Sequence, residues 1–108
     1  MDISLQEKKA LILKGIAHPV RMAIVETLSE KELCVCDIAE KFSCDRTTIS
    51  KHLTLLKDLG ILGCRKEGLH VYYRLDMKCL ATLLDCIEMV ASGKEPEATV
   101  ISCRCSDQ

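Results

Sequence analysis

Hydrophobic side chains recur every three or four positions along most of the chain, which is the period of amphipathic helices. This period predicts helices over residues 4–17, 19–28, 35–43, 46–59 and 76–92. Between the last two, residues 61–66 and 69–75 lie on either side of a predicted turn at Glu67-Gly68, which indicates a β-hairpin, and hydrophobic and polar positions alternate over residues 69–75. The second strand is expected to bury one face, formed by Leu69, Val71, Tyr73 and Leu75.

The order of these elements predicts a mainly α-helical fold with a small β-hairpin. Two consecutive short helices that are joined by a tight turn and followed by a basic hairpin form a winged helix-turn-helix. The 108 residues suffice for one modest core, so we expect one domain over residues 1–92 and a flexible, cysteine-containing tail over residues 93–108. The apolar faces of the first and last helices exceed what this core can cover, which predicts a homodimer.

The predicted helix over residues 46–59 carries hydrophobic side chains on one face and hydroxyl and basic side chains on the other. Asp45 is placed to cap its start and Gly60 to end it. The net charge is −1, yet residues 45–75 hold six basic and three acidic side chains, a local excess compatible with DNA binding. We expect base contacts from Thr47, Thr48, Ser50 and Lys51, and phosphate contacts from Arg46, Lys57, Arg65 and Lys66.

The three histidines require separate interpretation. On a helical wheel His52 falls beside the hydrophobic face, which favours a partly buried structural role over a base contact, although both stay open. His70 belongs to the polar side of the hairpin, where a DNA phosphate or water would meet it. His18 precedes Pro19 and is expected to be a structural turn residue.

Eight cysteines among 108 residues approach the density of a disulfide-bonded scaffold. However, the N-terminal segment lacks the features of a signal peptide, and no apolar run approaches the ~20 residues of a membrane span. We therefore expect a cytoplasmic protein without a membrane partner. In that reducing compartment, clustered cysteines more often bind metals or act in redox chemistry than form disulfides.

Cys34 and Cys36 form a Cys-x-Cys motif at the start of the predicted third helix. Residues two apart on a helix are separated by about 200°, so both thiolates cannot face one ion there. In an extended segment they share a face, so joint ligation requires the motif to be non-helical. Thiolates select soft ions such as As(III), Cd(II), Pb(II), Zn(II) or Cu(I).

Four segments, HPVRMAIVETL, ELCVCDIAEKF, TTISKHLTLLKDLGIL and RKEGLHVYYRL, resemble successive signatures of the ArsR/SmtB family of metal-responsive repressors. ELCVCD is similar to the metal-binding segment of its arsenite-sensing and cadmium/lead-sensing branches. The resemblance implies a cytoplasmic homodimer that binds operator DNA when metal-free and releases it on binding metal. No cofactor is then required for DNA binding. The implied inducer is a soft metal or metalloid ion, with As(III) favoured over Cd(II), Pb(II) and Zn(II), and two-fold symmetry predicts an inverted-repeat operator.

The sequence departs from this family in the ligands beyond the first two. Ala39 stands where the closest arsenite sensors have a third cysteine, and residues 1–33 lack the cysteines that the cadmium/lead branch uses. Cys64 is expected to be structural, and packing at a dimer interface is favoured over ligation for Cys79 and Cys86. The candidates preferred as further ligands are therefore Cys44 and the tail pair Cys103 and Cys105.

Two other classes of function are weighed against this one. A thiol-based redox or reactive-sulfur sensor on the same fold pairs cysteines of the second and last helices, and residues 19–28 contain none. An enzyme is not expected, because the chain lacks a strand-to-helix nucleophile site, paired catalytic carboxylates and a Gly-rich phosphate loop.

Overall fold

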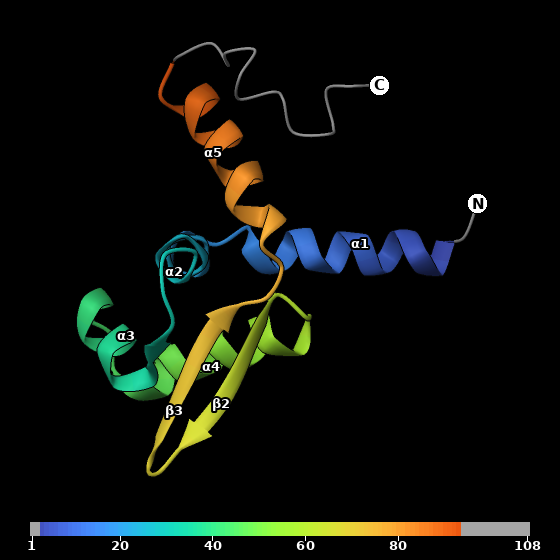
Figure 1. Ribbon diagram of the computed structural model, residues 1–108. Coiled ribbons are helices and arrows are strands. Elements are labelled where there is room, and N and C mark those ends of the chain that lie inside the picture. The colour runs from blue at the N-terminus through green and yellow to red at the C-terminus, as the bar shows by residue number, and fades with distance from the viewer. Residues whose placement is uncertain (1–2, 94–108) are drawn as a thin grey trace. The chain divides into compact units, whose positions relative to one another are not determined.

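The computed structural model describes residues 3–93, and their elements follow the predicted order with one additional strand (Figure 1). The elements are α1 (Ile3–Ile16), α2 (Pro19–Leu28), β1 (Leu33–Cys34), α3 (Val35–Phe42), α4 (Arg46–Asp58), β2 (Leu62–Glu67), β3 (His70–Leu75) and α5 (Cys79–Ala91). Five helices and a small antiparallel sheet confirm the winged helix-turn-helix predicted from the sequence. The chain forms two compact units, Met1–Met77 and Lys78–Gln108.

The sheet has three antiparallel strands in the order β1-β3-β2. The additional strand β1 pairs Leu33 with Tyr73 and Cys34 with Tyr72. A strand of two residues has no hydrophobic period of its own, so the alternation that predicts the hairpin does not reveal it. Its pairing attaches the segment before α3 to the wing, which is the β2-β3 hairpin.

The turn of the wing differs from the prediction by one residue. Glu67 pairs with His70, so the turn is Gly68-Leu69 rather than Glu67-Gly68, and Gly68 takes the left-handed φ of 63° that the tight turn needs. Leu69 is 96% exposed at this turn. The expectation that Leu69 belongs to the buried face was therefore wrong, whereas Tyr73 and Leu75 are buried as predicted.

The close approach of α1 to α4 depends on Gly15. This glycine is buried inside α1, where a Cβ atom would meet the side chains of Leu55 in α4 and of Leu59, which follows α4. It therefore permits a close contact between the two helices, while α1 continues to Ile16. Arg21 Nε donates a hydrogen bond of 2.6 Å to the Gly15 carbonyl oxygen, which satisfies an acceptor at the end of α1.

The helix-turn-helix consists of α3, a tight turn and α4. Ser43 ends α3 in a left-handed conformation with φ 53°. Asp45 caps α4 by accepting a hydrogen bond of 3.1 Å from the Thr48 backbone N–H. Hydrogen bonding with the Thr48 side chain, and then with this backbone N–H, lowers the pKa of the Asp45 carboxyl. On its inner face α4 buries Ile49, Leu53 and Leu56 completely, and it packs against α3, β2, α1 and α2. These contacts fix the orientation of α4 and leave its opposite, outer face exposed to solvent.

The second unit contains α5, which begins later than predicted. The helix was expected from residue 76, but the backbone N–H groups of Asp76 and Met77 donate to the Ile61 carbonyl oxygen at 3.0 and 3.1 Å. Helical hydrogen bonding therefore starts only at Cys79. Among the helices of residues 3–93, none combines the length and the hydropathy needed to cross a membrane.

Candidate metal centre and nucleic-acid interface

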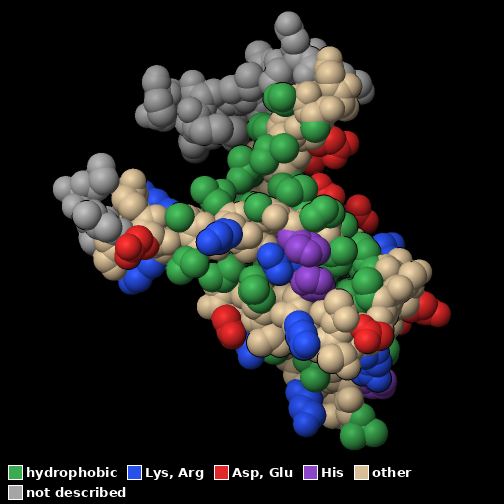
Figure 2. Space-filling view, turned by 180° about the vertical axis from the view of Figure 1, so that it is seen from behind, with side chains coloured by type: hydrophobic (Ala, Val, Ile, Leu, Met, Phe, Trp, Pro, Cys, Tyr) green, Lys and Arg blue, Asp and Glu red, His purple; other side chains and the backbone are tan. Residues whose placement is uncertain are grey.

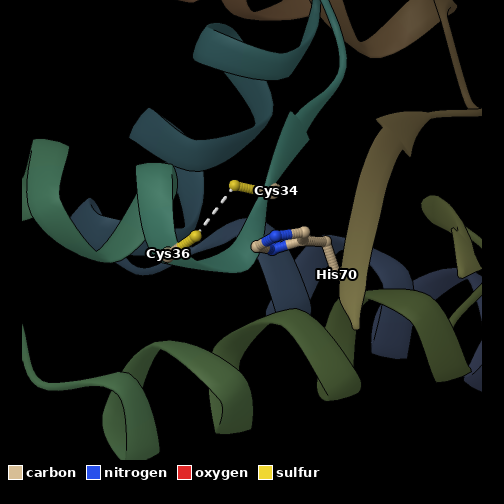
Figure 3. Close-up of side chains that lie close together, drawn as sticks. All are labelled: Cys34, Cys36 and His70. Carbon is tan, nitrogen blue, oxygen red and sulfur yellow. Dashed lines mark hydrogen bonds between the residues drawn. The ribbon is translucent and has the colours of Figure 1, made fainter. Parts of the chain in front are cut away.

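The Cys-x-Cys motif lies at a junction between a strand and a helix. Cys34 ends β1 and precedes α3 with an extended backbone at φ −80° and ψ 160°, while Cys36 lies in the first turn of α3. The two Sγ atoms are 3.0 Å apart (Figure 3). The sequence required that the motif not be wholly helical if both thiols are to face one ion. The extended backbone at Cys34 meets this requirement.

His70 is the third possible ligand group at this junction. Its imidazole points from β3 toward the two thiols (Figure 3), and the ligand atoms of Cys34, Cys36 and His70 all lie within 4.8 Å of one another. Cys34 is buried, Cys36 is half-buried and His70 is exposed. Sequence reasoning placed His70 toward phosphate or water, because the strand that carries Cys34 to its side was not foreseen.

The environment of Cys34 favours the protonated form of its thiol. The hydrogen bond between the two thiols raises the pKa of Cys34, and burial raises it further. The Asp37 backbone N–H, at the start of α3, lowers the pKa of Cys34 by less than the Cys36 hydrogen bond raises it, and the effect of burial is smaller than either. Because metal ligation needs thiolates, an ion that binds here must displace protons.

The other predicted thiol ligands lie elsewhere. Cys44 precedes α4 and is not part of the Cys34–Cys36–His70 group that the structure shows within residues 3–93; its thiol donates to the Phe42 carbonyl oxygen at 3.4 Å. Cys103 and Cys105 lie outside the described residues. These three assignments stay predictions.

The outer face of α4 presents the residues predicted to contact DNA. Arg46, Thr47, Thr48, Ser50, Lys51 and Lys57 are all exposed. Most of them line a shallow hollow along the helix, together with Thr54 and Asp58. Short polar and basic side chains near the start of an exposed helix are suited to the major groove, where base edges offer donors and acceptors.

Arg65 of the wing is engaged by neighbouring carboxylates. Its Nε donates to Glu32 at 2.9 Å, its Nη1 donates to Glu67 at 2.9 Å, and its guanidinium lies 4.8 Å from the centre of the Tyr72 ring. Arg65 therefore spans the sheet from β2 across β3 to the segment before β1. Its charge is compensated within the protein, which makes the neighbouring exposed Lys66 the better candidate for a phosphate contact on the wing.

His52 belongs to a cluster between α4 and the start of α2. Its ring centre is 4.8 Å from that of His18, and Figure 2 shows neighbouring histidines at the surface beside basic and hydrophobic side chains. Arg21 Nη1 lies 3.5 Å from His52 Nδ1. His18 also caps α2, because its Nδ1 accepts from the Val20 backbone N–H at 3.1 Å. This geometry supports the structural role for His52 that the helical wheel favoured.

Stability should depend on the protonation of His52. Burial lowers the pKa of His52 below its ordinary value of 6.5, and the nearby His18 and Arg21 lower it further. The unfolded state then binds more protons than the folded state just below this value, so the free energy of unfolding should fall as the pH drops through it and should not depend on His52 well above it. Urea unfolding from pH about 7.5 to about 5.5 measures this dependence. His52→Gln should reduce the dependence of the free energy of unfolding on pH. An unchanged pH dependence would show that His52 is not the group responsible.

Comparison with known proteins identifies the chain. Residues 18–62 match the family described as "Bacterial regulatory protein, arsR family". The winged helix-turn-helix domain of Mb0332 from Mycobacterium bovis, "a possible ArsR-family transcriptional regulator", is 31% identical, with a TM-score of 0.74 and coverage of 83% of each chain. The chain belongs to the ArsR family. Its relatives are transcriptional regulators, which confirms the prediction that it is not an enzyme.

Two proteins similar to this chain have names that refer to resistance to cadmium or to arsenic. The cadmium resistance transcriptional regulatory protein CadC homolog of Staphylococcus aureus is 44% identical over 77 residues, 70% of this chain and 64% of that protein. The arsenical resistance operon repressor of Escherichia coli is 45% identical over 65 residues, 59% of this chain and 56% of that protein. The chain thus spans less than two thirds of the length of either relative.

Proposed function

We propose that this ArsR-family protein is a transcriptional repressor that leaves its operator DNA when a soft metal or metalloid ion binds at Cys34 and Cys36. The observation that carries the proposal is the 3.0 Å approach of the two thiols at the junction from β1 into α3. The names of the cadmium-resistance and arsenical-resistance relatives support it and favour a metal over a redox signal.

The position of the thiols suggests how the ion would act on DNA binding. Cys36 belongs to α3, and α3 packs against α4, which presents the DNA-contacting face. An ion held by both thiols would fix the backbone at the start of α3. A helix-turn-helix binds DNA through the relative placement of its two helices, so a shift of α3 changes the fit of α4 to the groove. The metal-free protein needs no cofactor to bind DNA.

Two thiolates leave positions around the ion for further ligands. Cys44 and the tail pair Cys103 and Cys105 stay in the proposal as thiol candidates, and a set of three thiolates would suit As(III). Because the proposed target is operator DNA, the proposed place of action is the cytoplasm.

The experiment that tests this function is a release titration. Fluorescence anisotropy of labelled operator DNA is followed while As(III), Cd(II), Pb(II) or Zn(II) is added to the full chain under reducing conditions. At least one of these ions should release the DNA at a stoichiometry near one ion per chain. If none releases it, and an oxidant does, the protein is a redox sensor instead.

A homodimer is part of the proposed function. Leu5, Leu11 and Leu13 of α1 are 48%, 53% and 55% exposed, and Figure 2 shows hydrophobic side chains along this helix. The Mb0332 domain is described as homodimeric. Two-fold pairing would cover these side chains and would match an inverted-repeat operator with half-sites one or two DNA turns apart.

Sedimentation at micromolar concentration should therefore give twice the mass of the chain. Leu11→Asp should shift the equilibrium toward monomer by placing a charge on the covered face, whereas Lys14→Ala on the same helix should not. A monomeric wild-type chain would refute the dimer.

A further inference from the structure

We propose that His70 supplies the third protein ligand of the metal site, so that the ion is held by two thiolates and one imidazole. This inference rests on the proposed function and gives it a ligand set that suits a tetrahedral divalent cation such as Zn(II) or Cd(II) better than As(III). It assigns a metal-binding role to the wing, which otherwise serves DNA binding alone.

The register of the sheet explains why His70 reaches the thiols. β1 pairs Leu33 with Tyr73 and Cys34 with Tyr72. Continued by two residues, this antiparallel register would set Cys36 opposite His70. The chain turns into α3 at this point, yet the three ligand atoms still lie within 4.8 Å of one another. The backbone pairing of β1 with β3 thus brings the segments that carry the three side chains next to one another.

The neighbourhood of His70 also holds the wing in place. The Tyr72 ring lies edge-on to the imidazole, with ring centres 6.4 Å apart. Arg65 packs over the same Tyr72 ring and binds Glu32, the residue before β1. These contacts join the first half of β3 to the segment that carries Cys34.

The distances fit an ion after small side-chain movements. Zn–S bonds of about 2.3 Å in a tetrahedral site separate two sulfurs by roughly 3.8 Å, against 3.0 Å between the thiols in the structure. Rotation of the Cys36 and His70 side chains can make this change without altering the strands. Since Cys34 is buried and His70 is exposed, the fourth position faces solvent and is open to water or another ligand.

The chemistry of the donor set decides the class of ion. Zinc uses two thiolates and one imidazole in sites that keep a fourth position open. As(III) is most stable with three thiolates, and this set offers only two. The soft thiolates also exclude Mg(II) and Ca(II), which take oxygen ligands.

The test measures metal affinity directly, without DNA. Cd(II) and Zn(II) are titrated into the 108-residue chain in competition with a chromogenic chelator, and As(III) binding is followed by the ultraviolet absorbance of the As–S bonds. Loss of a second-shell partner of a metal costs 10–100-fold in affinity, so His70→Ala, which removes a ligand, should weaken Cd(II) and Zn(II) binding by at least about tenfold. It should leave As(III) binding unchanged. Leu69→Ala, in the adjacent and 96% exposed position, is the control and should bind Cd(II) like the wild type.

A second experiment uses a variant that should gain affinity for As(III). His70→Cys would give three thiolates and should strengthen As(III) binding by at least about tenfold. The absorption spectrum of the Co(II)-loaded wild type should show tetrahedral coordination with two thiolates, and His70→Cys should add thiolate charge-transfer intensity.

The outcomes separate this inference from the proposed function. If His70→Ala binds Cd(II) and Zn(II) like the wild type while Cys34→Ser does not, the function stands and His70 is not a ligand. If His70→Ala weakens all DNA binding but no metal binding, His70 contacts phosphate and the inference is wrong. If Cys34→Ser keeps full metal affinity, the proposed site itself fails.

Discussion

Replacement of Cys34 or Cys36 by serine should abolish release of operator DNA by metal while DNA binding persists. A serine hydroxyl is a poor ligand for a soft ion, so the inducer concentration needed for release should rise by at least about 100-fold, or about 2.7 kcal/mol. DNA affinity should persist because neither thiol belongs to the outer face of α4. An operator anisotropy titration with Cd(II) measures both quantities.

Cys79→Ser is the matched control, since this thiol is exposed at the start of α5 and has no predicted part in the site. It should respond to metal like the wild type. Normal release from a Cys34→Ser protein would contradict the site, and release lost equally in Cys79→Ser would show a general effect of thiol removal.

The second large effect is expected on the outer face of α4. Lys51 is exposed in the hollow along this helix and is predicted to contact a base. Lys51→Ala should cost about 1–3 kcal/mol of operator affinity, or about 5- to 150-fold, with a smaller loss on random DNA. Lys66→Ala on the wing should weaken operator binding and random-DNA binding by the same factor. It should also reduce the slope of log affinity against log salt concentration by about one, as loss of a phosphate contact does.

The sequence alone had assigned this phosphate role to Arg65 as well. Because Glu32 and Glu67 already compensate its charge, Arg65→Ala should lower DNA affinity less than Lys66→Ala. The ratio of operator affinity to random-DNA affinity should fall in Lys51→Ala and stay unchanged in Lys66→Ala. The same ratio in both variants would contradict the assignment of a base contact to Lys51 and a phosphate contact to Lys66.

The sequence predicted the elements whose signals are local. The amphipathic period, the Asp45 cap and the alternation in the wing place α2, α3, α4 and the hairpin within a few residues of their bounds. The exposed polar face of α4 follows from the same period. Leu69 was misplaced because one residue of shift at a turn moves a side chain from a buried face to solvent.

The grouping of Cys34, Cys36 and His70 depends on a long-range contact. A pairing between residue 34 and residue 72 leaves no pattern in either segment, so the sequence could supply the thiols but not their neighbour. The requirement for a non-helical Cys34 was derivable, because two thiols two residues apart cannot share one helix face. The strand that meets this requirement is also the one that brings the imidazole.

The coupling between metal and DNA is tested most directly by the metal affinity of the protein with and without operator. Linkage requires that, if metal weakens DNA binding by some factor, DNA weakens metal binding by the same factor. Cd(II) affinity, measured by chelator competition in the presence of saturating operator, should therefore fall by the factor by which Cd(II) lowers operator affinity. Random DNA at the same concentration serves as the control. An unchanged Cd(II) affinity on the operator would show that the thiol site and the DNA-binding face are not coupled.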